Sequence, residues 1–275
     1  MHPILFKLGP LAIHSYGLML ALSFVIGAQV ALREGARRGL PVDQLSTLCL
    51  WILALAVVGA RMLYVVSHAE SYAGRWLDAF KLWEGGLTMY GGFVAALAGA
   101  WFYTRRHRLP MGTVFDAFSP AIALGSGITR LGCFLNGCCF GRPCDLPWGV
   151  TFGPDSSPGR IYPGLELHPT QLYMSLVGFL NFFLLTRWSR RFTRPGQLFF
   201  VFLFIESGSR LVIDFFRHYE PGGESVVLGG IQLSLTQVVC LVLVVTAAVG
   251  LVSGALRRAP ASPAAPAAPA VRSDP

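Results

Sequence analysis

The sequence has little charge: only 13% of its 275 residues are Asp, Glu, Lys or Arg, whereas soluble domains carry about 25%. Because 53% of the residues are hydrophobic, we predict an integral membrane protein and exclude a soluble globular one. No small-residue cleavage site follows the apolar stretch from Leu11 to Leu32, which is also too long for the core of a signal peptide. We therefore expect this first helix to be retained. No segment resembles a nucleic-acid-binding module, so the net charge of +8 predicts contact with anionic lipid and no nucleic-acid partner.

Seven stretches are apolar enough to cross a bilayer, which takes about 20 residues each. They are Ile13–Leu32, Leu45–Ser67, Leu87–Tyr103, Thr113–Asn136, Pro169–Arg187, Gln197–Phe216 and Leu233–Leu256. Twelve basic residues lie on one side of these stretches and six on the other. Since short cytoplasmic loops are enriched in Lys and Arg, we expect the N-terminus outside and the C-terminus in the cytoplasm. The predicted fold class is an all-α integral membrane protein, with seven transmembrane helices around a central polar cavity.

The segments between these stretches also carry expectations. His68 to Gly86 mixes aromatic and polar residues, which predicts a helix lying in the outer interface. Gly141 to Leu167 is polar, rich in turn residues and longer than an ordinary connection, which indicates a functional loop. Residues 259–275 consist mainly of Ala and Pro and predict a disordered cytoplasmic tail. We therefore expect one membrane domain over residues 1–258.

Three arginines, Arg61, Arg130 and Arg210, lie within apolar stretches. A charged side chain in a membrane helix is costly unless it faces a polar cavity or a partner, so each is a candidate functional residue. A snorkelling side chain or a structural contact between helices is the alternative. Arg210 shares a helix face with Glu206 and Asp214, and there the alternative is a self-neutralising triad. Together, the three cations predict a cavity that binds an anion.

Four cysteines, Cys133, Cys138, Cys139 and Cys144, fall within twelve residues near the predicted outer face. We predict a structural disulfide between Cys139 and Cys144, because a glycine and a proline between them allow the chain to turn back. Cys133 and Cys138 are then expected to remain thiols. A metal site is a second interpretation, weakened by the absence of CxxC pairs, and a nucleophile with His168 as its base is a third. The sequence thus predicts no metal and no cofactor.

Six short segments carry a family signature in a fixed order over residues 14 to 217. They are His14-Ser15-Tyr16-Gly17-Leu18-Met19, Gly59-Ala60-Arg61, the glycine pairs at 85–86 and 91–92, Arg130-Leu131-Gly132 through Asn136-Gly137, His168-Pro169-Thr170-Gln171-Leu172-Tyr173, and Arg210 followed by Phe215-Phe216-Arg217. Their combination resembles the phosphatidylglycerol:prolipoprotein diacylglyceryl transferases of bacterial inner membranes.

The resemblance implies an enzyme that moves a diacylglyceryl group from phosphatidylglycerol to the lipobox cysteine of a prolipoprotein and releases glycerol 1-phosphate. Its implied partners are phosphatidylglycerol, prolipoprotein signal peptides and membrane lipids, and its implied location is the bacterial inner membrane. The implied catalytic residues are Arg130, Arg210 and Tyr90. The implied substrate-binding residues are Arg130, Tyr16, Arg61, Asn136, Gln171 and Asp214.

The sequence departs from the family pattern where acid-base chemistry is expected. Tyr90 stands at the position of a usual histidine, and Met174 and Asp214 stand where glutamates are usual. Thr129, Cys133 and Cys138 replace Gly, Asn and Glu of the family signature. A phenol with a pKa of about 10 is a poor base at neutral pH, so Tyr90 needs nearby arginines. The alternative function is a lipid-binding or transport paralogue, either non-catalytic or of altered specificity.

Overall fold

The computed structural model describes residues 4–8, 11–72, 74–81, 85–219, 225–228 and 231–256. Its long helices are α1 (Ser15–Arg37), α2 (Val42–Ser67), α3 (Met89–Arg106), α4 (Met111–Asn136), α6 (Thr170–Trp188), α7 (Gln197–Asp214) and α8 (Leu235–Leu256). Each overlaps one of the seven predicted apolar stretches, so the prediction of a helix is confirmed at all of them. The expected tail over residues 259–275 lies outside the described residues.

Four of these helices, α1, α2, α4 and α8, are long and apolar enough to cross a membrane. Only 17% to 39% of the most apolar window of each is buried inside the protein. Large apolar side chains such as Leu50, Val66, Phe93 and Phe102 are exposed on the helix surfaces. Such surfaces are favourable against lipid and unfavourable against water, so the chain is a membrane protein.

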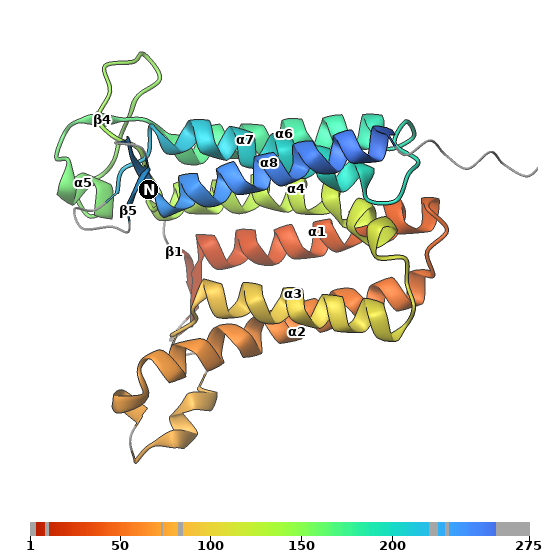
Figure 1. Ribbon diagram of the computed structural model, residues 1–275. Helices are drawn as coiled ribbons and strands as arrows, with labels where there is room; N and C mark the ends of the chain where they lie inside the picture. Colours follow the sequence, from red (N-terminus) through yellow and green to blue (C-terminus); the bar gives the residue numbers. More distant parts are fainter. Residues whose placement is uncertain are drawn as a thin grey trace, which may run out of the picture.

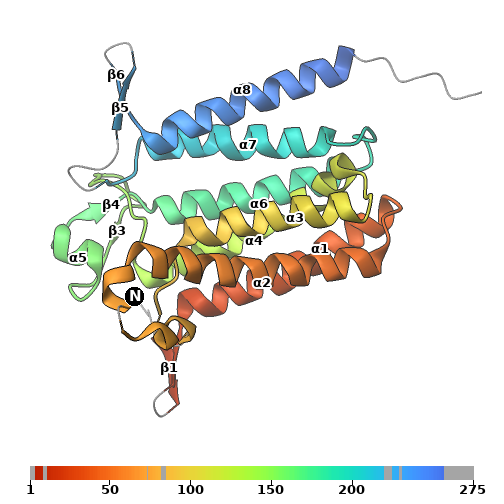
Figure 2. The ribbon, with the colours of Figure 1, turned by 60° about the horizontal axis from the view of Figure 1, so that its bottom comes forward.

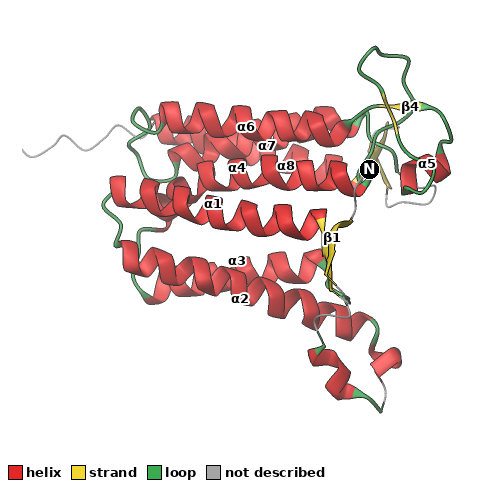
Figure 3. Cartoon of the chain, turned by 180° about the vertical axis from the view of Figure 1, so that it is seen from behind, coloured by secondary structure: helices red, strands yellow, loops and turns green. Residues whose placement is uncertain are grey.

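Short antiparallel strand pairs gather at one end of the helix bundle, which we call the strand end (Figures 1 and 3). The strands are β1 (Ile4–Leu8), β2 (Leu11–His14), β3 (Val150–Thr151), β4 (Glu166–Leu167), β5 (Ser225–Leu228) and β6 (Ile231–Ser234), and the short helix α5 (Ser157–Ile161) lies with them. The connections from α1 to α2, from α3 to α4 and from α6 to α7 lie at the opposite end, the turn end.

Helix α4 holds the bundle together because it packs against α1, α6 and α7. Glycines allow these close approaches: a Cβ at Gly178 of α6 would lie 2.6 Å from the backbone nitrogen of Gly127 in α4, and one at Gly132 would lie 2.9 Å from Cβ of Met19 in α1. Helices α2 and α3 pack mainly against each other and form a separate arm (Figure 1), while α7 and α8 lie side by side (Figure 2). A Cβ at Gly91 of α3 would overlap the carbonyl oxygen of Gly59 in α2, so the second glycine pair serves helix packing.

The two longest segments between the helices have different structures. The expected interfacial helix over His68 to Gly86 is wrong in detail, because its described part forms two short 3₁₀ helices, η1 (Ala69–Tyr72) and η2 (Trp76–Phe80). The Gly141 to Leu167 loop instead packs on the strand end around Phe140, Phe152 and Leu167. Backbone bonds from Gly141 to His168 and from Arg142 to Phe216 fasten this loop to the ends of α6 and α7.

Candidate functional site at the strand end

Arg130 lies near the C-terminal end of α4, partly buried, where α1, α4 and α7 meet the strand end. Its positive charge interacts with Tyr16 at the start of α1 and with Arg210 on α7. It also interacts with Cys133 and Cys139. Arg130 is therefore near enough to Tyr16 and to Arg210 for their charges to interact, and the sequence predicted all three residues for one site.

Arg210 is surrounded by more positive than negative charge. Its guanidinium lies 2.6 Å from the sulfur of Met174 and 3.8 Å from a carboxylate oxygen of Asp214. The charges of Arg217 and Arg130 both act on it, in addition to that of Asp214. Its side chain is 16% exposed, so water screens this repulsion only weakly. Arg210 thus senses two other guanidinium charges and the nearby Asp214 carboxylate, an arrangement that a bound anion would stabilise.

Asp214 also has a structural role, in addition to its long ion pair with Arg210. Its carboxylate accepts hydrogen bonds from the hydroxyls of Tyr219 and Ser234, which lie after α7 and directly before α8. Glu206 does not join Arg210, because its carboxylate accepts from Ser126 and Asn181 instead. The self-neutralising triad is therefore not formed: among the described residues, Asp214 is the carboxylate that approaches Arg210, and it is shared with two hydroxyls.

Three thiols meet beside Arg130. The sulfur atoms of Cys133, Cys138 and Cys139 all lie within 4.8 Å of one another. Cys144 is free as well, so the predicted disulfide between Cys139 and Cys144 is not present. The physical reason is that Cys139 turns toward the end of α4, with a backbone φ of +61°, and not along the loop toward Cys144.

The start of α6 fixes the turn after α4 that carries Cys138 and Cys139, which we call the thiol turn. The hydroxyl of Thr170 donates to the carbonyl of Cys139, and the amide of Gln171 donates to the carbonyl of Cys138, both at 2.8 Å. Both side chains are almost completely buried. A left-handed backbone is costly for a residue other than glycine, and these two bonds help to stabilise it at Cys139. Gln171, predicted to bind substrate, thus positions the turn in this structure.

The thiol turn has an unusual charge environment. The pKa of the Cys139 thiol is lowered, because Cys133 and Cys138 hydrogen-bond to it and because Arg217 and Arg130 favour a negative sulfur. Asn136, the last residue of α4, is exposed and its side chain reaches the thiol of Cys138. The predicted contact residue Asn136 therefore lies at the thiol turn, on its accessible side.

Arg61 does not reach this site. Its guanidinium is buried and donates to five backbone carbonyls, those of Asp78, Ala79, Lys81, Gly85 and Gly86. These bonds occupy all of its N–H groups and hold the η1–η2 segment against α2. The geometry does not support substrate binding by Arg61; its buried charge is satisfied by the segment that follows α2.

Tyr90 is also separate from the arginines. It lies in the first turn of α3, in the α2–α3 arm, with 71% of its surface exposed. Within the described residues, no hydrogen bond or ring contact joins it to Arg130 or Arg210. His168, the other candidate base, pairs with the hydroxyl of Tyr173 at 3.2 Å, which in turn accepts from Trp148.

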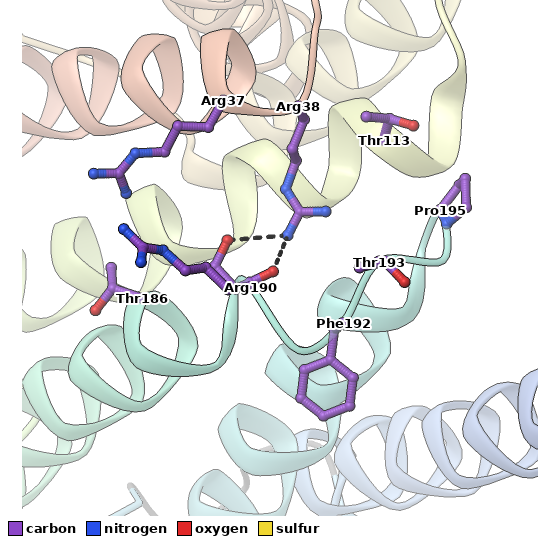
Figure 4. A pocket seen from close by; sticks show the side chains of 9 residues that line it. Arg37, Arg38, Thr113, Thr186, Arg190, Phe192, Thr193 and Pro195 are labelled. Atoms are coloured by element: carbon purple, nitrogen blue, oxygen red, sulfur yellow. Dashed lines mark hydrogen bonds between the residues drawn. The ribbon is translucent and has the colours of Figure 1, made fainter.

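A second group of arginines lines a cavity of about 540 Å³ at the turn end (Figure 4). Here Arg38 donates to Ser189 and lies 3.3 Å from Asp116, while Arg37 lies 2.9 Å from Glu34. Asp116 is fully buried and also accepts from the backbone nitrogens of Gly196 and Phe199 at the start of α7. These charges are paired within the fold, which gives them a structural role.

Sequence reasoning missed two features of the strand end. It named Arg217 only as the end of a family segment and gave it no role, whereas its charge acts on Arg210 and on Cys139. It also divided the cysteines in the wrong way, because it weighed their spacing along the chain and not the turn after α4. A glycine at 137 with φ +74°, which ends α4, was the available signal for that turn.

Comparison with known proteins identifies the family of this chain. A family model described as prolipoprotein diacylglyceryl transferase matches residues 3–253. The chain is 31% identical over 247 residues to the phosphatidylglycerol--prolipoprotein diacylglyceryl transferase of Halalkalibacterium halodurans, which covers 89% of this chain and 83% of the relative. The protein of the same name from Pseudomonas fluorescens is 31% identical over 94% of this chain and 95% of its own length. The one from Bordetella bronchiseptica is 34% identical over 78% of this chain and 82% of its own length. The chain belongs to the prolipoprotein diacylglyceryl transferase family.

Proposed function

We propose that this protein transfers the diacylglyceryl group of phosphatidylglycerol to the lipobox cysteine thiol of a prolipoprotein and releases glycerol 1-phosphate. The observation that carries the proposal is the group formed by Arg130, Arg210 and Tyr16, which holds excess positive charge at the end of a lipid-exposed helix bundle. The names of the relatives give the donor and acceptor classes.

The chemistry requires charge stabilisation more than any other contribution. The leaving group gains a second negative charge on its phosphate as its bond to the glyceryl carbon breaks. Arg130 and Arg210 approach from different helices and would form paired hydrogen bonds with this phosphate, which lowers the energy of the transition state. Tyr16 would donate its hydroxyl to the same group. Asp214 would keep Arg210 oriented without cancelling the charge of the whole cluster.

We infer that all seven long helices cross the inner membrane around a polar cavity, with the strand end outside. The arginines of the turn end, at the connections from α1 to α2, from α3 to α4 and from α6 to α7, support a cytoplasmic position for it. The anion site formed by Arg130 and Arg210 would then face the outer side of the membrane, and the acceptor cysteine would have to reach it there.

The test is transfer by the purified protein in vesicles that contain labelled phosphatidylglycerol, with a lipobox peptide as acceptor. Arg130→Lys keeps the charge and removes the planar pair of donors, so we expect transfer to fall by roughly a hundredfold. Arg160→Lys is the matched control, because Arg160 is an exposed arginine of α5 at the same end. Equal transfer by both variants would refute phosphate binding by Arg130.

The non-catalytic alternative predicts a different result in the same vesicles. A lipid-binding paralogue would bind phosphatidylglycerol in an Arg130-dependent manner and form no thioether on the peptide. Mass spectrometry of the peptide separates the cases, because a diacylglyceryl thioether adds a defined mass to the cysteine. Restoration of growth in cells depleted of their own transferase would support the enzyme in vivo.

A further inference from the structure

The three thiols at the end of α4 have the arrangement of a tetrahedral metal site with one open position. Zinc binds thiolates at about 2.3 Å, which puts sulfur atoms of one tetrahedron about 3.8 Å apart. The sulfur atoms of Cys133, Cys138 and Cys139 lie within 4.8 Å of one another. Side-chain rotations that move the sulfur atoms by about 1 Å would bring them to that distance.

Several features keep the three sulfur atoms together. Cys133 is supplied by the last turns of α4, and Cys138 and Cys139 follow Gly137, where the backbone reverses. Thr170 and Gln171 hold the carbonyls of the turn from the neighbouring helix. Cys133 is 5% exposed, whereas Cys138 and Cys139 are partly exposed, which leaves an approach from the turn's outer side.

We propose that Cys133, Cys138 and Cys139 bind one Zn²⁺ whose fourth position takes the thiol of the acceptor peptide. The inference rests on the proposed transfer function and deepens it, because it supplies an activated acceptor where the family's histidine is replaced by Tyr90. Sites with three protein ligands and one open position are the catalytic form of zinc coordination.

The surrounding charge favours such a complex. Zn²⁺ with three thiolates carries a net charge of −1, and binding of the acceptor thiolate makes the net charge −2. Arg130 and Arg217, whose charges act on the thiol turn, would compensate it. Asp214 is the one carboxylate described beside Arg210 and balances the local positive charge only in part, so the metal complex would also relieve the repulsion among the arginines.

The chemical step balances without a protein base. The peptide thiol binds the metal as a thiolate, and its proton passes to water, because a coordinating metal deprotonates a thiol at neutral pH. A sulfur electron pair then attacks the glyceryl carbon that carries the phosphate ester. The carbon–sulfur bond forms as the carbon–oxygen bond breaks, and the phosphate oxygen keeps that electron pair. Glycerol phosphate leaves against Arg130 and Arg210, and the neutral thioether dissociates.

The first experiment measures metal binding by the full-length protein in nanodiscs. We expect one equivalent of Zn²⁺ per chain, in competition with a chromophoric chelator, and a loss of affinity of roughly 100-fold or more in Cys133→Ser, Cys138→Ser and Cys139→Ser. Cys144→Ser is the matched control, because Cys144 is a partly buried free thiol of the same region outside the three-thiol group. Sub-stoichiometric binding, or equal affinity in all four variants, would overturn the site. So would a disulfide between any two of the three cysteines in the protein as purified.

The second experiment tests the open position with a readout other than activity. Co²⁺ replaces Zn²⁺ and reports each bound sulfur by its charge-transfer absorption. Addition of a lipobox peptide should increase this absorption, and the same peptide with Ser in place of Cys should leave it unchanged. An identical spectrum with both peptides would overturn the role of the metal in thiol binding.

The outcomes separate this inference from the proposed function. If transfer depends on Arg130 but is unchanged after zinc is removed with a chelator and in Cys139→Ser, the transferase stands and the zinc inference fails. If zinc binds to the three cysteines and cobalt reports the peptide thiol, yet no thioether forms under any condition, the site stands and the proposed function fails. Loss of transfer on chelation, restored by Zn²⁺, supports both.

Discussion

The two ends of the bundle use arginine in opposite ways. At the turn end, Arg38 is paired with the buried Asp116, and Arg37 is paired with Glu34. At the strand end, the charges of Arg130 and Arg217 both act on Arg210, and within the described residues the ion pair of this group is the longer contact of Arg210 with Asp214. The difference shows that the surrounding carboxylates, more than burial, separate a structural arginine from one available to a ligand.

The strongest test of this comparison replaces one arginine at each end and measures both transfer and stability. Arg210→Gln should reduce transfer by roughly a hundredfold or more while thermal stability changes little, because it removes a charge that repels its neighbours. Arg38→Gln should do the reverse: it leaves Asp116 with a weaker partner, lowers the melting temperature and keeps transfer per folded molecule. Transfer in vesicles and thermal unfolding in detergent measure both. A strong loss of transfer in Arg38→Gln would contradict the separation of roles.

Asp116→Ala is expected to have the largest effect on stability alone. The carboxylate is fully buried and accepts from Arg38 and from two backbone nitrogens of α7. Its removal leaves those donors unsatisfied and should lower the free energy of unfolding by roughly 3 kcal/mol. Chemical unfolding monitored by tryptophan fluorescence checks this. Asp155→Ala, in the loop before α5, is the control and should change little; equal loss in both would argue against the buried network.

A smaller, local effect is expected at Arg61. Arg61→Lys keeps the charge but replaces five directed donors by one ammonium group, so several carbonyls of the η1–η2 segment lose their partner. We expect faster hydrogen exchange over residues 69–81 with transfer reduced by less than about tenfold, since the lost bonds are worth roughly 1 kcal/mol each. Abolished transfer with unchanged exchange would return Arg61 to the substrate site.

The smallest effect is expected for Tyr90→Phe. The hydroxyl is exposed on the α2–α3 arm, and activation of the acceptor by a metal would make it dispensable, so transfer should stay within roughly threefold of the parent protein. Initial rates at several pH values check this. A hundredfold loss with an unchanged melting temperature would show that Tyr90 is the base that its family position implies.

The sequence predicted the helices better than the site. Apolar runs of sufficient length leave the chain few alternatives in a membrane, so every predicted stretch contains a helix. Arg130 and Arg210 were also predicted for one site, because a charge in an apolar run is informative by itself, whereas Tyr16 was added only by the family resemblance. The thiol group was not, since the spacing of Cys133 and Cys138 is not a known metal pattern and only the left-handed turn after α4 brings them together. Arg61 was assigned to substrate because it is a charge in an apolar stretch, and the sequence did not show that the segment after α2 would fold back and supply five carbonyls to it.

The contact between Gly127 and Gly178 connects helix packing to this chemistry. The backbones of α4 and α6 touch there, and Gly178 lies seven residues from Gln171, a distance of about 10 Å along the helix. A methyl group at Gly178 would tilt α6 away from α4 and move the two side chains that hold the thiol turn. The position of the sulfur atoms is thus set in part by a residue that has no side chain, and substitutions at this crossing should mimic substitutions in the site itself.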